Sequence, residues 1–343
     1  MARAMMRAFA VDSPGPIESH PLRLVERPVP DPGIGQILVR VHSCGVCRTD
    51  LHLAEGDLAP RLPLTVPGHE IVGVVDRLGP QASGRFDLGD RIGVAWLAST
   101  CGVCRFCRRG NENLCVSPNF TGWDRDGGYA EYALADEDFA YRLPQGFDDA
   151  TVAPLLCAGI IGYRSLRRSS LRRGGVLGIY GFGASAHLTA QVALAEGGTV
   201  HVLTRSPEAQ QLALGLGCAS AGGAYDHPPE PLDAAVLFAP VGDLVPTCLA
   251  ALDRGGTLAI AGIHLSDIPR LNYASHLFGE RTVRSVTANT RKDGRDFLEI
   301  AARIDIKVTT TPYPFEDANT ALLDLAQDRV QGAAVLVFPA SGS

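Results

Sequence analysis

Residues 176–206 have the hydrophobic pattern of a β-strand, a glycine-rich turn, a helix and a second strand. The apolar run VLGIY at 176–180 is followed by GFGASA, by the helix-like HLTAQVALAEGG and by the strand-like TVHVLTRS. Two further strand-like runs with glycine turns follow, DAAVLFAP at 233–240 and GTLAIAGI at 256–263. Strands that alternate with helices in this way predict an α/β fold with a doubly wound parallel sheet.

The turn GFGASA has the G-x-G-x-x-A spacing of a dinucleotide-binding turn. Gly181 and Gly183 permit a tight turn and close approach of a pyrophosphate, and Ala186 lets the helix pack near the strand. Ala184 and Ser185 open the helix, whose N-terminus favours an anion. We therefore expect a dinucleotide site here; the alternative is a turn that binds no phosphate.

Composition limits the class of protein and the class of partner. A chain of 343 residues, 46% hydrophobic and 20% charged, is too long for one ordinary core and too apolar for disorder, so we expect two domains. The formal net charge of -6, the pI near 5.8 and scattered arginines argue against nucleic acid and favour a small molecule as partner. No apolar run approaches the roughly 20 residues that span a bilayer, so no membrane role is expected.

The nine cysteines point to metal or catalytic work in a reducing compartment, and we expect a soluble, cytoplasmic protein. Four of them lie in CGVCRFCRRGNENLC, with the spacing C-x2-C-x2-C-x7-C. This spacing favours a closed, structural zinc site. A four-iron cluster fits less well because it prefers x3 and a proline around its fourth cysteine, and four buried apolar cysteines would require a coincidence of spacing. The predicted ligands are Cys101, Cys104, Cys107 and Cys115.

A second, dispersed set consists of Cys47, of His69 and Glu70 in PGHE, and of Cys157 in PLLCAGIIGY. Two thiolates and an imidazole would leave a fourth zinc position open. Spacing alone does not link these residues, and each by itself is more often a packed core residue. In SCGVCRTDLH at 43–52, the pair Cys44 and Cys47 can be read as a redox pair, as part of a metal site, or as one reactive thiol beside an inert one.

These motifs together resemble the zinc-dependent alcohol dehydrogenases of the medium-chain dehydrogenase/reductase superfamily. GVCRTDLH, PGHE, the four-cysteine segment, GGYAEY at 127–132, PLLCAGIIGY and the glycine turn occur in that family's order. The resemblance implies a GroES-like, largely β catalytic domain at 1–158, with a zinc lobe at 96–116, completed by 292–343. It implies a Rossmann domain at 159–291.

The resemblance also implies the ligands of a catalytic zinc. Cys47, His69 and Cys157 match the ligand positions, whereas Cys44 does not. Glu70 matches a carboxylate that lies near the metal and can replace its water transiently. With the four-cysteine lobe, the resemblance implies two zinc ions per chain.

The residues that follow Cys47 match the family's positions for proton transfer and cofactor binding. Asp50 matches a carboxylate that orients the ligand histidine. Thr49 matches the hydroxyl that bonds the substrate oxygen, and His52 the group that passes the proton towards solvent. Arg48 matches a residue that pairs with the cofactor pyrophosphate. Without the resemblance, this segment reads as a polar turn after a strand.

The sequence departs from the family pattern at three positions. Ile161 stands where many relatives have a threonine behind the nicotinamide, and Ala333 where many have an arginine near the cofactor phosphates. Leu58 replaces a tryptophan of ethanol-preferring relatives, while Trp96 and Trp123 are retained as candidate aromatic walls. We expect a roomier pocket that prefers medium-length or aromatic primary alcohols and their aldehydes to ethanol.

The residues after the second strand bear on the cofactor. An NAD enzyme usually has an acidic residue about 20 residues after the glycine turn. Here the sequence has Thr204, Arg205 and Ser206, and Arg205 suits a 2′-phosphate. We therefore predict NADP(H); if the triplet is only a strand-to-helix turn, both NADP(H) and NAD(H) are used.

The expected function is hydride transfer between a primary alcohol/aldehyde pair and a nicotinamide cofactor. A polyol or formaldehyde dehydrogenase would share the zinc ligands and differ in its pocket. A catalytically inactive dinucleotide-binding protein is the alternative outside enzymes. We also expect a homodimer or homotetramer.

Overall fold

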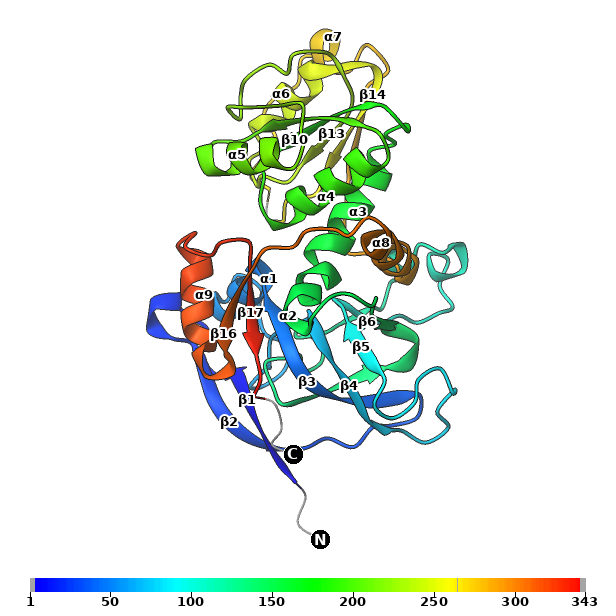
Figure 1. The fold of residues 1–343 in the computed structure, drawn as a ribbon, viewed down its shortest axis with the longest axis vertical. Helices are drawn as coiled ribbons and strands as arrows, with labels where there is room; N and C mark the ends of the chain where they lie inside the picture. Colours follow the sequence, from blue (N-terminus) through cyan, green and yellow to red (C-terminus); the bar gives the residue numbers. More distant parts are fainter. Residues whose placement is uncertain (1–3, 264, 340–343) are drawn as a thin grey trace. The chain divides into compact units, whose positions relative to one another are not determined.

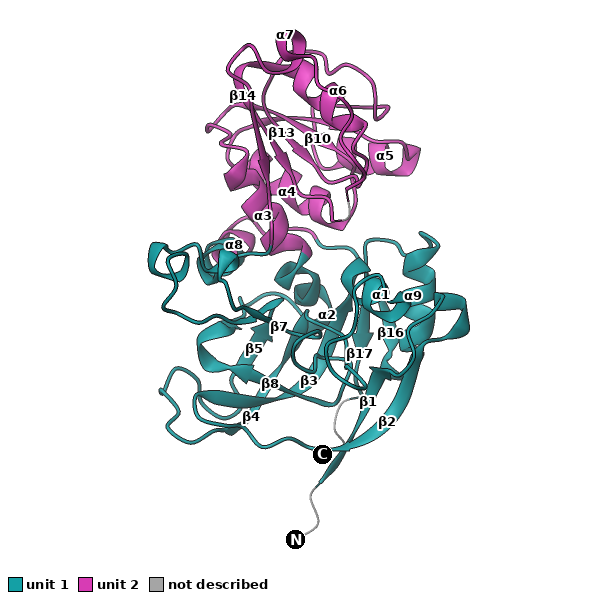
Figure 2. Cartoon of the chain, turned by 180° about the vertical axis from the view of Figure 1, so that it is seen from behind, with its two compact units in different colours: residues 1–157, 288–298, 308–343 teal, residues 158–287, 299–307 magenta. Residues whose placement is uncertain are grey.

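The computed structural model describes residues 4–263 and 265–339. The chain divides into two compact units, shown in separate colours in Figure 2. Unit 1 comprises residues 1–157, 288–298 and 308–343, and unit 2 comprises residues 158–287 and 299–307. The C-terminal segment 292–343, which the sequence analysis assigns to the catalytic domain, includes residues 299–307 of unit 2.

Unit 2 contains a six-stranded sheet in the order β12-β11-β10-β13-β14-β15, and every neighbouring pair is parallel. Its strands are β10 (Val176–Tyr180), β11 (Thr199–Leu203), β12 (Ser220–Gly222), β13 (Leu232–Leu237), β14 (Leu252–Ile260) and β15 (Thr282–Ser285). The chain runs outward from β10 to β12 and then returns to the other side of β10 at β13. This reversal confirms the predicted doubly wound sheet, and such sheets bind ligands where the strand order reverses.

Helices join successive strands of this sheet except β12 and β13, and a further helix, α3, precedes β10 (Figure 1). They are α3 (Ala158–Arg168), α4 (Ala184–Ala195), α5 (Pro207–Gly215), α6 (Leu244–Ala251) and α7 (Tyr273–His276). Helix α4 packs closely on α3 because Gly162 of α3 has no side chain: a Cβ there would lie 2.4 Å from the Thr189 hydroxyl oxygen. The apolar side chains of the central strands are fully buried, which is typical of a parallel sheet covered on both faces.

Unit 1 is built on a seven-stranded sheet in the order β16-β17-β3-β4-β5-β9, in which β8 also pairs with β3. A two-stranded pair, β1 and β2, and a shorter pair, β6 and β7, accompany it. The strands are β1 (Met5–Val11), β2 (Leu22–Pro28), β3 (Gln36–Val46), β4 (Ile71–Leu78), β5 (Arg91–Val94), β6 (Leu97–Ser99), β7 (Asn119–Phe120), β8 (Tyr132–Asp136), β9 (Ala140–Arg142), β16 (Thr310–Pro314) and β17 (Ala333–Val337). Apart from the parallel pair β16 and β17, the pairings in this sheet are antiparallel.

The C-terminal part of the chain completes this sheet next to the candidate site. Strand β17 pairs with the last residues of β3, with Val335 opposite Gly45 and Ala334 opposite Val46. Cys47 directly follows these residues of β3. The backbone that leads into Cys47 is therefore fixed by β17, a strand almost 290 residues further along the chain. The helices of unit 1 are α1 (Arg48–Glu55), α2 (Asp149–Val152), the first part of α8 (Arg291–Arg303) and α9 (Ala318–Ala326).

Within the part of the chain that the structure describes, no helix is both long and apolar enough to cross a bilayer.

Candidate metal centre and cofactor turn

Helix α1 begins at Cys47 because its first turn is capped by side chains. Cys47 has an extended backbone, and its Sγ accepts the backbone N–H of Thr49 at 3.3 Å. The Asp50 carboxylate reaches back and accepts the Cys47 N–H at 3.0 Å. These bonds satisfy N–H groups that a helix start leaves without partners, and they fix the Cys47 thiol at the end of strand β3.

Asp50 also fixes the second candidate ligand. Its other oxygen accepts the backbone N–H of Gly68 at 2.9 Å and lies 3.4 Å from Nδ1 of His69. Gly68 is required here because its φ is 96° and a Cβ would lie 2.4 Å from the Tyr129 ring. The carboxylate therefore holds the imidazole with its Nε2 directed towards Cys47.

The dispersed residues converge on one point in unit 1. Nε2 of His69 lies 3.3 Å from Sγ of Cys47 and 3.4 Å from Sγ of Cys157. These atoms and a Glu70 carboxylate oxygen all lie within 4.8 Å of one another. His69 and Glu70 are almost completely buried. Two sulfurs, an imidazole and a carboxylate at such distances form the donor set of a catalytic zinc site.

The charges at this centre are strongly coupled. A hydrogen bond from the Cys157 thiol, followed by the charge of His69, holds the pKa of Cys47 well below its usual value. The same bond to Cys47, together with burial, raises the pKa of Cys157 well above its usual value. Burial and then the Cys47 thiolate raise the pKa of Glu70. A divalent cation would allow both thiols to ionise, as metal binding requires.

Cys44 lies outside this group. Its side chain is fully buried, and its Sγ is 3.5 Å from the carbonyl oxygen of Gly45. A Cβ added at Gly68 or at Gly128 would lie 2.8 Å from that sulfur. Burial raises the pKa of Cys44 well above its usual value, so the thiol is neutral and acts as a packing group.

An aromatic wall, consisting of Trp96, Phe120 and Trp123, lies beside the metal centre. The Trp96 ring packs edge-on against His69, with 4.9 Å between ring centroids. Trp96 stacks on Phe120 at 4.8 Å and lies 6.1 Å from Trp123 with an interplanar angle of 11°. The sequence analysis named the two tryptophans but missed Phe120, which nothing in the local sequence pattern distinguishes from a core residue.

The remaining residues of α1 and its following loop occupy distinct environments. Thr49 is half-buried, one residue beyond the Arg48 that begins α1. Nδ1 of His52 lies 3.0 Å from an Asp57 oxygen. Arg48 donates to the Asp328 carboxylate at 2.6 Å through one of its guanidinium nitrogens. The half-buried Leu58 donates its backbone N–H to the His52 carbonyl.

The four-cysteine lobe brings its sulfurs together around a second point. Sγ of Cys104 is 3.5 Å from Sγ of Cys107, and Sγ of Cys115 is 3.5 Å from Sγ of Cys101. All four sulfurs lie within 4.8 Å of one another. Backbone N–H groups of Cys101, Cys104 and Ser117 point at the sulfurs, at 3.3–3.4 Å. N–H groups directed at sulfur stabilise thiolates, so this closed set also fits zinc.

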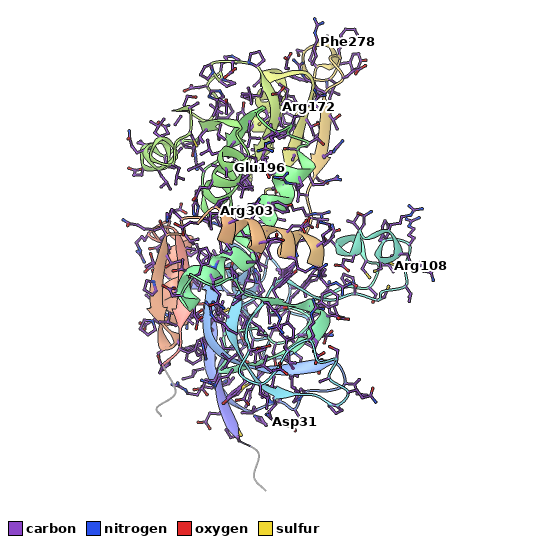
Figure 3. All side chains as sticks on the ribbon, turned by 45° about the vertical axis from the view of Figure 1, so that its right-hand side comes forward. Asp31, Arg108, Arg172, Glu196, Phe278 and Arg303 are labelled. Carbon is purple, nitrogen blue, oxygen red and sulfur yellow. The ribbon has the colours of Figure 1, made fainter. Side chains whose placement is uncertain are left out.

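The thiols of the lobe differ in pKa. Backbone N–H groups of Cys107 and Val116 lower the pKa of Cys104 to about 6. Burial, together with the neighbouring thiols, raises the pKa of Cys107 to about 11. The arginines between the cysteines are exposed, and Arg108 lies on the surface of the lobe (Figure 3).

A partly buried ion pair ties the lobe to the C-terminal part of unit 1. Glu112 of the lobe accepts the Arg291 guanidinium at 2.7 and 3.0 Å and also its backbone N–H at 2.7 Å. The guanidinium covers the Phe139 ring, with its central carbon 4.5 Å from the ring centroid. No sequence pattern indicates this pair, because 179 residues separate its members.

In unit 2, the glycine turn joins β10 to α4. Gly181 has φ 83°, and a Cβ there would lie 2.8 Å from the backbone nitrogen of Ala239. Gly183 is the N-cap of α4, and nothing lies within 4 Å of the place where its Cβ would be. Ala184 and Ser185 form the first turn of α4, and Ala186 is fully buried. Open space before a helix N-terminus fits a cofactor phosphate.

The predicted phosphate-binding triplet ends at a helix cap. Ser206 is the N-cap of α5: its hydroxyl accepts the Ala209 N–H at 3.1 Å and donates to Glu208 at 2.7 Å. Thr204 is buried, whereas Arg205 is exposed. Of the triplet, Arg205 is therefore the side chain best placed to meet a ligand phosphate. Ile161 lies half-buried in α3.

Comparison with known proteins identifies the family. Residues 33–145 match the alcohol dehydrogenase GroES-like domain. The chain is 59% identical to the probable alcohol dehydrogenase AdhA of Mycobacterium tuberculosis, over 98% of each chain. It resembles the structure of a cinnamyl alcohol dehydrogenase from Sorghum bicolor, with TM-score 0.86, 26% identity and 97% and 98% of the two chains covered.

A second similar structure is that of a thermostable alcohol dehydrogenase from Pyrobaculum aerophilum with bound cobalt and zinc. Its TM-score is 0.86 at 26% identity, and the match covers 97% of this chain and all of that one. These matches extend over nearly the whole chain and confirm that it has the expected GroES-like domain and the expected parallel-sheet domain. The chain therefore belongs to the zinc-dependent alcohol dehydrogenases of the medium-chain dehydrogenase/reductase superfamily.

Proposed function

We propose that this enzyme transfers a hydride between a primary alcohol/aldehyde pair and a nicotinamide cofactor, with NADP(H) preferred to NAD(H). The observation that carries the proposal is the convergence of Cys47, His69 and Cys157 on one buried point. Zinc held by these three residues would supply Lewis-acid polarisation of the alcohol oxygen. Every position of the ligand set is filled, which counts against an inactive dinucleotide-binding protein.

The chain's own residues orient the centre and move the proton. Asp50 fixes the tautomer and direction of His69, and Glu70 supplies a buried carboxylate beside the ligands. We assign proton transfer to Thr49, whose hydroxyl would accept the alcohol proton while it gives up its own, and to His52, which would deliver a proton to solvent. Asp57, 3.0 Å from Nδ1 of His52, orients that ring.

We assign the second zinc to the lobe, where Cys101, Cys104, Cys107 and Cys115 would fill all four positions. A zinc ion without an open position acts on structure, not on substrate. Through Glu112 and Arg291, the lobe fixes the start of α8.

The NADP(H) preference rests on Arg205. No carboxylate occupies residues 204–206, and the exposed guanidinium offers a planar pair of donors to a 2′-phosphate. The Ser206 hydroxyl, already bonded to Glu208 and Ala209, contributes less than the sequence suggests. The Glu208 carboxylate, 2.7 Å from that hydroxyl, opposes a phosphate and leaves NAD(H) as the second cofactor.

Pocket residues support medium-length or aromatic primary alcohols over ethanol. Leu58 is smaller than the tryptophan that ethanol-preferring relatives have at this position. The aromatic wall gives an apolar surface beside His69. The similar Sorghum bicolor protein is named for cinnamyl alcohol, which is an aromatic primary alcohol. Polyol and formaldehyde dehydrogenase activities are the alternatives, and a substrate panel separates them.

We further propose a cytoplasmic homodimer or homotetramer. All nine cysteines are free, and metal-binding thiols need a reducing compartment. Strand β15 is an edge of the unit 2 sheet, and Tyr273 and Phe278 are 67% and 69% exposed nearby in the chain. Such an edge with apolar side chains suits pairing with a second copy.

The proposed function is tested by steady-state rates on ethanol, hexanol, benzyl alcohol, sorbitol and formaldehyde with both cofactors, on protein of measured zinc content. Cys47→Ala should abolish turnover and leave the fold intact. Cys44→Ala, a matched removal of one thiol three residues away, should change turnover less than twofold because that thiol only packs in the core. Equal losses in the two variants would contradict the assigned ligands.

A further inference from the structure

Trp123, the outer member of the aromatic wall, makes two contacts with the segment that follows α1. Its indole Nε1 donates to the carbonyl oxygen of Ala59 at 2.9 Å. The guanidinium carbon of Arg61 lies 3.6 Å from the centroid of the ring. Arg61 in turn donates to the Asp124 carboxylate at 2.5 Å, so its planar group is fixed against the indole.

Asp124 itself is held by the backbone. Its second oxygen accepts the N–H of Phe120 at 2.9 Å, and its side chain is only 10% exposed. The carboxylate therefore joins Arg61 to the turn that carries both Phe120 and Trp123. An arginine stacked on an aromatic ring and paired at its edge has little freedom to move.

The segment that carries Arg61 has no regular secondary structure to hold it. Residues 57–64 lie between the end of α1 and the bridge at Thr65, in turns and bends. This segment includes Leu58, the residue that widens the expected pocket. Two residues of this segment contact Trp123, Ala59 through its backbone carbonyl and Arg61 through its guanidinium, while Leu58 is held by its backbone bond to the His52 carbonyl.

The opposite end of the wall contacts the metal centre. Trp96 lies edge-on to the candidate ligand His69, and the rings of Trp96 and Trp123 are stacked nearly parallel, with 6.1 Å between their centroids. A displacement of Trp123 would thus change the apolar surface available to a substrate bound beside His69. It would leave His69 itself in place, because Asp50 holds that ring.

We propose that Arg61 is a positioning residue for substrate selectivity. Arg61 holds Trp123 in a fixed position relative to the segment that carries Leu58. It thereby maintains the surface of the aromatic wall on which an aromatic or medium-length primary alcohol packs. Ethanol is too small to reach that part of the wall and does not depend on Arg61. This inference rests on the proposed alcohol dehydrogenase function and adds a determinant outside the metal ligands.

Arg61→Ala and Arg61→Lys test the proposal, with the ratio of kcat/KM for benzyl alcohol to kcat/KM for ethanol as the readout. Arg85→Ala is the matched control, because Arg85 also lies over a ring, that of Phe86 at 5.9 Å, and pairs with an aspartate, Asp138 at 3.2 Å. Loss of the stacked guanidinium should lower the ratio about three- to tenfold through KM for benzyl alcohol. Arg61→Lys should lower it too, because an ammonium cannot stack as a planar group.

Tryptophan fluorescence gives a second readout, since Trp96 and Trp123 are the only tryptophans of the chain. Emission should shift in both Arg61 variants and stay unchanged in Arg85→Ala. An active enzyme whose ratio is the same in wild type, Arg61→Ala and Arg61→Lys overturns the inference alone. A wild-type enzyme that oxidises neither alcohol with either cofactor overturns the proposed function, and the inference with it.

Discussion

The Glu70 carboxylate occupies the space that a side chain at Gly45 would need. A Cβ on Gly45 would lie 1.8 Å from the Glu70 carboxylate oxygen and 2.6 Å from its carboxyl carbon. The backbone N–H of Gly45 also donates to the Glu70 carbonyl at 3.0 Å. Strand β3 is fixed at this point by its pairing with β17, so the strand cannot move away. The Glu70 carboxylate can therefore lie beside the metal ligands only if residue 45 is glycine.

Gly45→Ala should therefore displace Glu70 and lower kcat more than tenfold, with about 1–3 kcal/mol of stability lost to overpacking. Thermal melting and turnover measure the two effects. Gly215→Ala is the control, because nothing lies within 4 Å of a Cβ at that position of α5. In the double variant Gly45→Ala/Glu70→Ala, part of the stability should return while activity does not. Normal activity in Gly45→Ala would show that Glu70 is not placed as described.

Asp50→Asn should weaken metal binding at the catalytic centre. The Asp50 carboxylate accepts N–H groups of Cys47 and Gly68 and lies beside Nδ1 of His69. The amide of the Asp50→Asn variant would have only one acceptor oxygen, and its NH2 group would face an N–H donor. It therefore cannot make all three contacts of the carboxylate. We expect zinc affinity to fall about 10- to 100-fold, as for other carboxylates that orient a ligand histidine. Titration with a zinc chelator checks this, and an unchanged release curve contradicts it.

The Glu112–Arg291 pair should make stability depend on pH in a defined direction. Burial raises the pKa of Glu112, but the hydrogen bonds and charge of Arg291 outweigh it, and the net pKa is lowered. A group whose folded pKa is lowered stabilises the fold above its unfolded pKa, about 4.3, and this stabilisation disappears as pH falls through the folded pKa. Glu112→Gln should cost about 1–3 kcal/mol at pH 7.

Melting temperatures of wild type and Glu112→Gln should therefore converge as pH falls below about 4. Asp12→Asn is the control, since Asp12 pairs with Arg23 at 3.3 Å on the exposed surface and should change little at any pH. A difference between wild type and Glu112→Gln that grows on acidification would contradict the assigned sign.

Cofactor choice should respond in opposite directions to Arg205 and Glu208. Arg205→Ala should lower kcat/KM for NADP by one to two orders of magnitude, since hydrogen bonds to charged groups contribute about 1.5–3 kcal/mol, and leave NAD almost unchanged. Glu208→Gln should raise kcat/KM for NADP severalfold, because it removes the negative charge of the carboxylate that accepts the Ser206 hydroxyl and opposes a phosphate. If the wild type prefers NAD and Arg205→Ala alters neither cofactor, the 204–206 triplet is only a helix cap.

The sequence predicted those features that depend on local pattern. The glycine turn, the strands around it and the cysteine lobe each lie within a short stretch, so spacing alone constrains their geometry. The link between Cys47, His69 and Cys157 came only from family resemblance, because no local period connects residues 110 positions apart. The structure brings these three together without reference to that resemblance.

Contacts between distant segments could not be predicted. Phe120, Arg61 and Glu112 look like ordinary core or surface residues until the fold brings Trp96, Trp123 and Arg291 to them. The inert role of Cys44 likewise depends on how closely Gly68 and Gly128 approach its sulfur. For Ser206, the sequence allowed both a phosphate contact and a helix cap, and the structure shows the cap.

Elemental analysis of the purified, fully active enzyme tests the central claim most directly. The two separate donor sets, Cys47 with His69 and Cys157, and the four cysteines of the lobe, cannot share one ion. We predict two zinc ions per chain in the wild type and in Cys44→Ala, and one in Cys47→Ala. One zinc ion per chain in fully active wild-type enzyme, or iron in the lobe, would contradict the account.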